Sequence, residues 1–401
     1  MMGFEQRDAE ELIALVRSHH LKSPSQILIR RGGLADLGTV AGGIADPGGV
    51  FLVVGGTSST AFGAGERARG ALVSRGFEVA RSMSVAEEPQ VRRVDEGAAL
   101  ARENSPRVIV AIGGGSVIDC GKAVAALATN EGSVEDYLEG VGRGFSLQHD
   151  PLPMIAVPTT SGTGAEMTKN AVIADHDKGF KKSMRDERMI PTAALLDPDL
   201  TKTVPRDVTA ASGMDAITQL IEPCISTKRQ PGPTAVAHRA LEHVRAALPL
   251  CCRAPDHSGA RAAMAVASGM SGVCLANSGL ALAHGIASGL GGLHRVAHGL
   301  ICGILLPHTL RFNRAACESE LAEALAHFLN EEAVNEDTID RGIAELDRLI
   351  EETGVPPDLT FLNLTDAQIR EVAAHSMGSS MTGNPVAMDE ERIYAFLRPL
   401  M

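Results

Sequence analysis

Short apolar runs alternate with amphipathic stretches in the first half of the chain. Three of these runs end in glycine or hydroxyl residues: 51–56 (FLVVGG), 108–115 (VIVAIGGG) and 153–160 (PMIAVPTT). Stretches with helical periodicity lie at about 61–75 and 91–104. Strands separated by helices of this length pair in parallel through crossover helices. Because the strands are apolar along their whole length, we expect a sheet that is covered on both faces.

The pattern changes near residue 200, and no convincing strand follows Val208. Segments rich in Ala and Leu carry helical periodicity at 234–249, 261–274 and 337–353. A chain of 401 residues is long enough for two separate cores. We therefore predict an α/β domain over 1–200 and an all-helical domain over 201–401.

Charge and composition narrow the classes of function. The net charge is −12, no dense Lys/Arg tract is present, and aromatic residues make up 3% with no Trp. These values argue against a nucleic-acid surface. No apolar run reaches the roughly 18 residues of a membrane span, and the charged N-terminus does not resemble a secretory signal. The seven cysteines form no CxxC pair, which is typical of reduced thiols in a cytoplasm. We therefore expect a cytoplasmic protein that binds a small molecule and neither nucleic acid nor a membrane.

A glycine-rich loop is the strongest local motif. Gly113, Gly114, Gly115 and Ser116 follow an apolar strand and open a helix. Glycines let the backbone approach a ligand closely, and a helix start offers N–H groups to a phosphate. The spacing is neither GxGxxG nor that of a Walker P-loop. Phosphate binding is the favoured interpretation, and a plain tight βα turn is the alternative.

A second polar cluster, 158–166 (PTTSGTGAE), also follows an apolar strand. Open α/β sheets place their ligands at the carboxyl ends of parallel strands. The hydroxyls and glycines of this cluster therefore indicate ligand binding, with an ordinary hydroxyl-rich loop as the alternative.

Candidate metal ligands lie in the helical half. Asp215 and Gln219 are one turn apart on one helix face, and His284 and His298 follow 14 residues apart. A carboxylate oxygen with two imidazoles suits Fe²⁺ or Zn²⁺. Each of these residues taken singly is more often structural, so the prediction depends on the set.

Four motifs together resemble the iron-containing (group III) alcohol dehydrogenase family. They are GGGSVIDCGKA, VPTTSGTGAE, GMDAITQLIEP and LAHGIASGLGGLHRVAHGLICGILLPH, in this order. Weaker similarity extends from 27–38 to 383–391, so the resemblance covers nearly the whole chain. It implies a Rossmann-like dinucleotide-binding domain followed by a helical metal-binding domain, an architecture shared with dehydroquinate synthase, with the active site in the cleft. It also implies a homodimer or a larger assembly.

The resemblance assigns cofactor-binding roles to individual residues. The loop from Gly113 to Ser116 resembles the pyrophosphate loop, and Asp119 lies where the family has an acidic residue near the nicotinamide ribose. The residues that resemble those flanking adenine and nicotinamide are Thr159, Thr160 and Thr163, and Lys182 is counted with them as a cofactor contact.

Asp215, His284 and His298 resemble three of the family's four metal ligands, but two positions depart from the pattern. The fourth ligand is usually a His four residues after Asp215, and here it is Gln219, whose carbonyl oxygen is a weaker ligand. Ser288 replaces a second His four residues after His284. A divalent metal, Fe²⁺ or Zn²⁺, would then be bound with altered affinity or be absent.

The loop after the first nucleotide-domain strand bears on the choice of cofactor. Many family members have an Asp there that binds the ribose hydroxyl of NAD, whereas this chain has Gly55, Gly56, Thr57 and Ser58. Removal of the carboxylate removes repulsion against a 2′-phosphate, and the hydroxyls could bind it. We predict NADP(H) rather than NAD(H), with a simple turn that accepts NAD as the alternative.

We therefore predict an NAD(P)-dependent dehydrogenase that interconverts a small alcohol and its aldehyde or ketone, with a metal that polarises the substrate oxygen. His294 is the candidate proton carrier in place of the missing relay His, and a solvated loop His is the alternative. The second interpretation is a metal-independent reductase of a small anionic keto compound, similar to maleylacetate reductase, in which His294 and Arg295 supply charge. A dehydroquinate synthase-like lyase and a non-catalytic cofactor-binding module are further alternatives.

Overall fold

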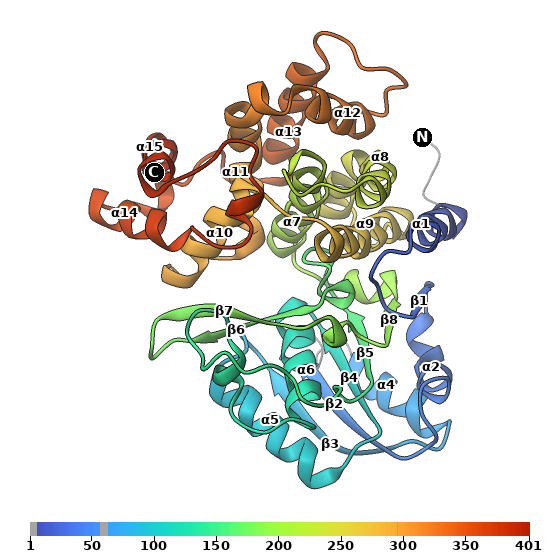
Figure 1. Ribbon diagram of the computed structural model, residues 1–401. Coiled ribbons are helices and arrows are strands. Elements are labelled where there is room, and N and C mark those ends of the chain that lie inside the picture. The colour runs from blue at the N-terminus through green and yellow to red at the C-terminus, as the bar shows by residue number, and fades with distance from the viewer. Residues whose placement is uncertain (1–5, 57–62, 295) are drawn as a thin grey trace. The chain divides into compact units, whose positions relative to one another are not determined.

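The computed structural model describes residues 6–56, 63–294 and 296–401, which form two compact units (Figure 1). The α/β unit comprises Ser23–Thr160 and Gly164–Val204. The helical unit comprises Pro205–Met401 together with Met1–Lys22 and Ser161–Thr163. The predicted fold class, an α/β N-terminal domain followed by an all-helical domain, is confirmed.

A parallel sheet forms the centre of the α/β unit. Its six described strands run in the order β1-β8-β5-β4-β2-β3, and all neighbouring pairs are parallel. The strands are β1 (Gln26–Ile29), β2 (Gly49–Gly55), β3 (Glu78–Val85), β4 (Val108–Gly113), β5 (Met154–Pro158) and β8 (Ala193–Leu196). The three apolar runs of the sequence therefore form β2, β4 and β5.

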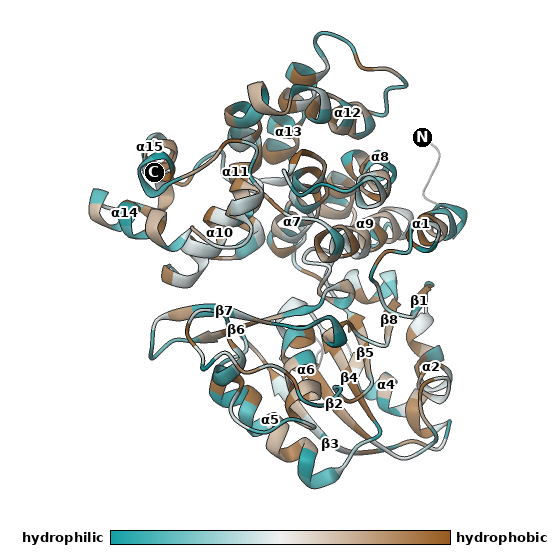
Figure 2. Cartoon of the chain, viewed as in Figure 1, coloured by the Kyte–Doolittle hydropathy of each residue, from teal (hydrophilic) through white to brown (hydrophobic). Residues whose placement is uncertain are grey.

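Alternate residues of the strands enter two separate cores, because successive side chains point to opposite faces of a sheet. Phe51 and Val53 of β2 lie in one core, and Val50 and Leu52 lie in the other. The helices around the sheet are α2 (Leu37–Gly42), α4 (Ala64–Val73), α5 (Val91–Asn104) and α6 (Gly115–Leu127). Figure 2 shows the apolar strands of this unit, with more polar helix surfaces around them. The predicted cover on both faces is confirmed.

An antiparallel hairpin, which the sequence pattern did not predict, packs against α6. Its strands are β6 (Asn170–Asp175) and β7 (Phe180–Arg185). Two buried charges of α6 hold it in place. Lys122 Nζ donates to Thr168 Oγ1 at 2.9 Å, and Asp119 Oδ2 accepts from Val172 N at 3.0 Å. Lys122 and Asp119 also form an ion pair at 2.9 Å, so each charge compensates the other.

Every regular element that the structure describes after Pro205 is helical. The α-helices are α7 (Arg206–Ile225), α8 (Pro231–Arg253), α9 (Ser258–Asn277), α10 (Leu282–Leu293), α11 (His298–Asn313), α12 (Glu318–Leu329), α13 (Thr338–Thr353), α14 (Asp366–His375) and α15 (Glu390–Leu397). The first helix, α1 (Gln6–Ser18), packs on α8 in this unit, although we expected it in the first domain. The reason is electrostatic as well as apolar, since Arg239 of α8 pairs with Asp8 and Glu11 at 3.0 Å.

Among the described helices, α9 is the one that is long and apolar enough to cross a membrane by length and composition. However, 83% of its most apolar window is buried inside the protein. A core helix packed on all sides has the same composition.

Glu166 is a buried carboxyl group of the α/β unit, in the short 3₁₀ turn η3 (Ala165–Met167). Its side chain is 2% exposed, and Oε1 has no hydrogen-bond partner among the described residues. Burial raises the pKa of Glu166 from 4.5 to about 7, although a backbone hydrogen bond and the charge of Lys122 oppose the shift. The folded chain therefore holds a proton on Glu166 that the unfolded chain releases at lower pH.

This shift predicts a loss of stability as pH rises. The contribution of the protonated carboxyl group is complete below the unfolded pKa of 4.5 and is lost as pH passes the folded pKa of about 7. We expect Glu166→Gln to remove this decline, which amounts to about 3 kcal/mol at most. Denaturant unfolding at about pH 5 and about pH 8 measures it, and Glu103→Gln, at an exposed position of α5, is the control. An equal decline in wild type and Glu166→Gln would contradict the assignment.

Candidate nucleotide loop and candidate metal centre

The glycine-rich loop joins β4 to α6 as the sequence predicts. Gly113 ends β4, and Gly114 is the N-cap of α6, with no side chain that caps the helix. Thr159 N donates to Gly113 O at 3.0 Å, and a Cβ at Gly114 would lie 3.3 Å from Thr160 Oγ1. The two predicted cofactor loops are therefore adjacent at one edge of the sheet. An uncapped helix start beside hydroxyl groups can receive a phosphate.

The end of β2 reaches the same sheet edge, because Val54 of β2 is in register with Ile112 of β4. Gly55 is the last residue of β2, and a Cβ at Gly56 would lie 3.1 Å from Ala86. Gly55 and Gly56 thus lie where a parallel sheet binds nucleotides. Thr57 and Ser58, the other two predicted contacts of this loop, lie outside the described residues.

Two predicted cofactor contacts, Asp119 and Lys182, are linked to the hairpin of β6 and β7. The carboxylate of Asp119 is engaged by Lys122 and by the backbone of β6, so it anchors the hairpin. Lys182 lies on β7, in register with Ile173 of β6. Their predicted roles toward the cofactor stay predictions.

Thr163 differs from Thr159 and Thr160, because it belongs to the helical unit. Its carbonyl oxygen accepts a hydrogen bond from Gln219 Nε2 at 2.9 Å. The neighbouring Gly162 approaches α7 so closely that a Cβ there would lie 2.7 Å from Ser212 Cβ.

The predicted metal ligands converge in the helical unit. Asp215 lies on α7, His284 in the first turn of α10 and His298 at the start of α11, and Cys302 joins them from one turn further along α11. One ligand atom from each of the four lies within 4.8 Å of those of the others. Asp215 Oδ1 is 3.5 Å from His284 Nε2, and Cys302 Sγ is 3.6 Å from His298 Nε2.

Two glycines of α11 allow this convergence. A Cβ at Gly299 would lie 2.6 Å from Ala211 O and 2.8 Å from Asp215 Cβ. A Cβ at Gly303 would lie 2.6 Å from Met214 Cβ. Because both positions lack a side chain, the backbone of α11 lies directly against α7, which brings its two ligand residues to Asp215.

Glu222 orients the first imidazole. It lies on α7 and is 1% exposed, and its Oε2 is 2.7 Å from His284 Nδ1. Because a carboxylate only accepts, His284 donates from Nδ1, and Nε2 faces Asp215 Oδ1. Burial opposes the charged imidazole, but Cys302, Glu222 and Asp215 raise the pKa of His284 well above its ordinary value. Nε2 would therefore become an electron-pair donor when a cation displaces its proton. A carboxylate behind a ligating His is the usual outer partner of a metal site.

The donor set fits a divalent metal ion. Asp215 Oδ1 and His284 Nε2 are buried and have no hydrogen-bond partner among the described residues. Burial opposes the charged form of Asp215, but the imidazoles of His284 and His298 hold its pKa below the ordinary value. Burial also raises the pKa of the Cys302 thiol to about 12. Unpartnered donor atoms that converge in a buried position are costly unless a cation satisfies them.

Gln219 lies between Asp215 and Glu222 on α7, and its amide nitrogen is fixed by two hydrogen bonds. Nε2 donates to Thr163 O and to Ser271 Oγ, each at 2.9 Å. Ser271 gives its own proton to Ser268 O, so both groups that face Nε2 are acceptors and the amide orientation is determined. The predicted role of Gln219 as a metal ligand stays a prediction.

The other polar candidates of α10 lie outside the cluster. Ser288 is exposed and donates to His284 O at 3.0 Å, so it does not replace the missing relay His. His294 is the C-cap of α10, and its Nε2 is buried without a hydrogen-bond partner among the described residues. Arg295 lies outside the described residues.

Cys302 and Glu222 are the residues that sequence reasoning missed. Each had a signal in the spacing: Cys302 is four residues after His298, and Glu222 is seven residues after Asp215. Both spacings place two side chains on one helix face.

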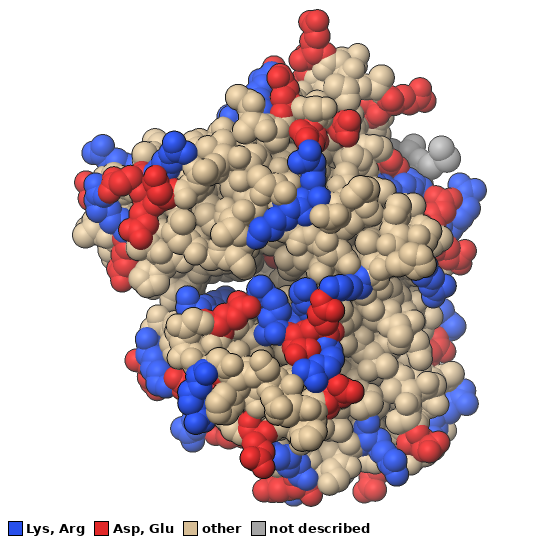
Figure 3. Space-filling model, viewed as in Figure 1, with Lys and Arg blue, Asp and Glu red and all other residues tan. Residues whose placement is uncertain are grey.

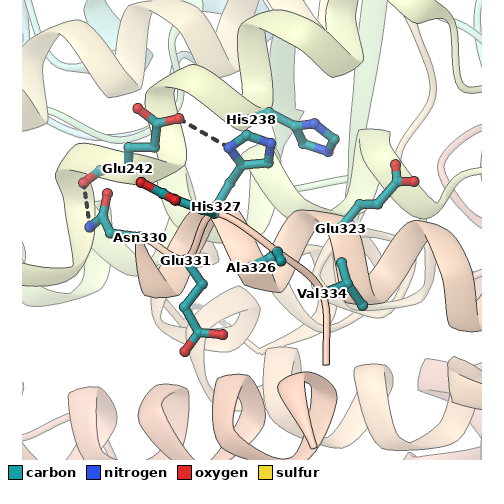
Figure 4. Close-up of a pocket in the computed structure, with 10 residues that line it drawn as sticks. His238, Glu242, Glu323, Ala326, His327, Asn330, Glu331 and Val334 are labelled. Carbon is teal, nitrogen blue, oxygen red and sulfur yellow. Dashed lines mark hydrogen bonds and ion pairs between the residues drawn. The ribbon is translucent and has the colours of Figure 1, made fainter. Parts of the chain in front are cut away.

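A cavity of about 440 Å³ lies elsewhere in the helical unit (Figure 4). The rings of His238 and His327 stack there with centroids 4.4 Å apart, and His327 Nδ1 is 3.0 Å from Glu242 Oε1. Burial lowers the pKa of His238 to about 4, with a smaller contribution from His327. None of the predicted site residues is among the described residues that line this cavity.

Both halves of the chain match models of one protein family. Residues 24–198 match the iron-containing alcohol dehydrogenase model, and residues 209–401 match the model for the C-terminal part of the same family. Alcohol dehydrogenase 4 of Saccharomyces cerevisiae (strain YJM789) is 31% identical over 350 residues, which are 86% of this chain and 90% of that protein. NAD-dependent methanol dehydrogenase of Bacillus methanolicus is 32% identical over 77% of this chain and 81% of its own length. The crystal structure of a 1,3-propanediol oxidoreductase has a TM-score of 0.87 and 27% identity, and the match covers 95% of this chain and 99% of that one.

A nucleotide loop on a parallel sheet and a buried His, carboxylate and thiol cluster on helices define a dehydrogenase of the class that uses a nicotinamide cofactor and a divalent metal. The chain belongs to the iron-containing alcohol dehydrogenase family. It is therefore an oxidoreductase that acts on alcohol or carbonyl groups.

The loop geometry predicts a clean test of cofactor binding. Among the described residues, a Cβ at Gly114 would meet only the side chain of Thr160. We therefore expect Gly114→Val to fold, while its branched side chain occupies the space of the pyrophosphate. We expect the Kd for NADPH or NADH to rise by about tenfold or more, a loss of about 1.4 kcal/mol. Fluorescence titration measures the affinity, and circular dichroism checks the fold. Unchanged affinity in a folded Gly114→Val protein would show that the loop does not hold the phosphates.

Proposed function

We propose that this chain is an NAD(P)-dependent alcohol dehydrogenase that interconverts a small alcohol and its aldehyde or ketone with the help of a divalent metal. One observation carries this proposal: Asp215 Oδ1 and His284 Nε2 are buried, face each other without a hydrogen bond among the described residues, and converge with His298. Relatives that are named for methanol and 1,3-propanediol support a small alcohol as the substrate class.

Asp215, His284 and His298 would hold the ion. When bound, a divalent ion in such a site supplies Lewis acidity toward the substrate oxygen. Glu222 keeps His284 in the tautomer with Nε2 free to ligate. Asp215 and His284 are 2% and 3% exposed, whereas His298 is partly exposed.

The α/β unit would hold the cofactor. The loop from Gly113 to Ser116 binds the pyrophosphate, with Thr159 and Thr160 beside it. The bound nicotinamide carries the hydride, so no side chain has to. We assign the proton transfer to His294, whose Nε2 is buried and unpartnered among the described residues.

The metal-independent reductase of an anionic keto compound is less well supported. That interpretation gives no role to the convergence of Asp215, His284 and His298 or to the carboxylate of Glu222. In that mechanism, His294 and Arg295 would have to supply positive charge to the anionic substrate. Measurement of the metal content of the purified protein separates the two mechanisms.

We further propose a cytoplasmic location and a homodimer or larger assembly. All seven cysteines are free and buried, which supports a reducing compartment. On the face shown in Figure 3, basic and acidic side chains are interspersed, which supports a small-molecule partner rather than a nucleic acid.

Removal of either imidazole tests the metal-dependent function. We expect His284→Ala and His298→Ala each to lose bound metal and turnover, while the Kd for the cofactor changes less than about threefold, because the nucleotide loop lies in the other unit. Metal content by mass spectrometry and turnover with a panel of aldehydes and keto acids measure this. His308→Ala, on the same helix but bonded to Pro357 O, is the control. Wild-type enzyme that turns over without metal and ignores a chelator would exclude this mechanism.

Cofactor preference is tested at the end of β2. We propose that NADPH is preferred, because the described end of this strand carries no carboxylate. Gly56→Asp should shift kcat/KM toward NADH by about tenfold, through repulsion of the 2′-phosphate. Because any Cβ at this position meets Ala86, Gly56→Ala serves as the steric control. A wild-type preference for NADH would refute the assignment.

A further inference from the structure

Two side chains are candidates for the fourth ligand of the metal centre, Gln219 on α7 and Cys302 on α11. Gln219 has the spacing of a ligand on α7, one turn after Asp215. However, its amide nitrogen is tied to Thr163 O and Ser271 Oγ, and both of these groups are acceptors. Because these bonds hold the amide nitrogen, Gln219 can offer a cation only its carbonyl oxygen, which is a weaker ligand for Zn²⁺ than a thiolate.

Cys302 brings a sulfur ligand atom to the cluster from α11. Its side chain is fully buried, and Sγ lies 3.6 Å from His298 Nε2 within the cluster of four ligand atoms. The close contact of Gly299 and Gly303 with α7 keeps this face of α11 against Asp215. Sγ lies within 4.8 Å of the ligand atoms of Asp215 and His284. Asp215 Oδ1 and His284 Nε2 are buried and make no hydrogen bond among the described residues.

We propose that Cys302 is the fourth metal ligand and that the resulting carboxylate, two-imidazole and thiolate set selects Zn²⁺ over Fe²⁺. This inference rests on the proposed function, in which the cluster holds the metal. Zn²⁺ takes four ligands in tetrahedral geometry and accepts thiolate, imidazole and carboxylate together. A soft sulfur ligand favours Zn²⁺, whereas oxygen and nitrogen ligands alone do not discriminate against Fe²⁺ in this way.

Cobalt substitution tests the ligand directly. Protein is stripped with a chelator and loaded with Co²⁺, and its absorption spectrum is recorded. We expect a near-ultraviolet sulfur-to-cobalt charge-transfer band in wild type and its loss in Cys302→Ser that still binds Co²⁺. Cys224→Ser is the matched control, because Cys224 is buried on α7 and its Sγ bonds the carbonyl of Leu220 one turn earlier. A wild-type spectrum without this band, or a band that survives in Cys302→Ser, would overturn the proposal.

X-ray absorption of the zinc-loaded wild type gives a second measurement that needs no variant. We expect one sulfur scatterer at about 2.3 Å from zinc, and nitrogen and oxygen scatterers alone would contradict the proposal. In anaerobic competition between equimolar Zn²⁺ and Fe²⁺, wild type should prefer zinc, and Cys302→Ser should lower that preference by at least about tenfold.

The outcomes separate this inference from the proposed function. Metal-loaded protein that reduces aldehydes with NADPH but shows no sulfur ligand would refute the role of Cys302 and leave the dehydrogenase intact. Protein that shows the sulfur ligand but no turnover with any alcohol or carbonyl compound would refute the dehydrogenase and leave the ligand intact. Protein that binds neither Co²⁺ nor Zn²⁺ would refute both.

Discussion

The candidate metal centre depends on one buried carboxylate, that of Glu222. It accepts from Ala281 N at 3.0 Å and from Ala283 N at 2.7 Å, and it is 2.7 Å from His284 Nδ1. Backbone N–H groups at a helix start lack partners within the helix, and a negative charge stabilises that end. The same side chain therefore begins α10, ties it to α7 and sets the orientation of its first imidazole. Folding of the helical unit and preparation of the ligand are thus one event.

Buried charges also hold neighbouring elements together in the α/β unit, beside its nucleotide loop. Asp119 and Lys122 lie on the helix that this loop begins, and they pair with each other and with the hairpin of β6 and β7. The helix that offers its N-terminus to a phosphate is held from the side by these contacts. The loop itself is left to glycines and hydroxyls, which fit a backbone that has to approach a ligand.

Strong local patterns made the fold predictable from the sequence. Continuous apolar runs became β2, β4 and β5, because a strand covered on both faces needs no polar positions. The hairpin was not predictable in this way, since 180–185 (FKKSMR) shows no run of apolar residues. Its strand pairs with β6, which packs against α6. In the site, Asp215, His284 and His298 could be found from motif order. For Cys302 and Glu222 the sequence offered only a helical spacing, because their roles arise from packing between helices that are distant in the sequence. The anchoring of Gln219 has the same origin, since Thr163 and Ser271 are far from it along the chain.

The glycine contact between α11 and α7 has a consequence for the cohesion of the helical unit. At Gly299 and Gly303 the backbone of α11 lies against α7, so these two positions contribute no side chain to the contact. An ion held by Asp215, His284 and His298 would tie α7, α10 and α11 together at this point. Such a cross-link closes long loops of the chain, and its entropic benefit grows with the length of the loops it closes. The ion would then stabilise the tertiary structure as well as take part in the reaction. Exchange of the metal would require these three helices to loosen together.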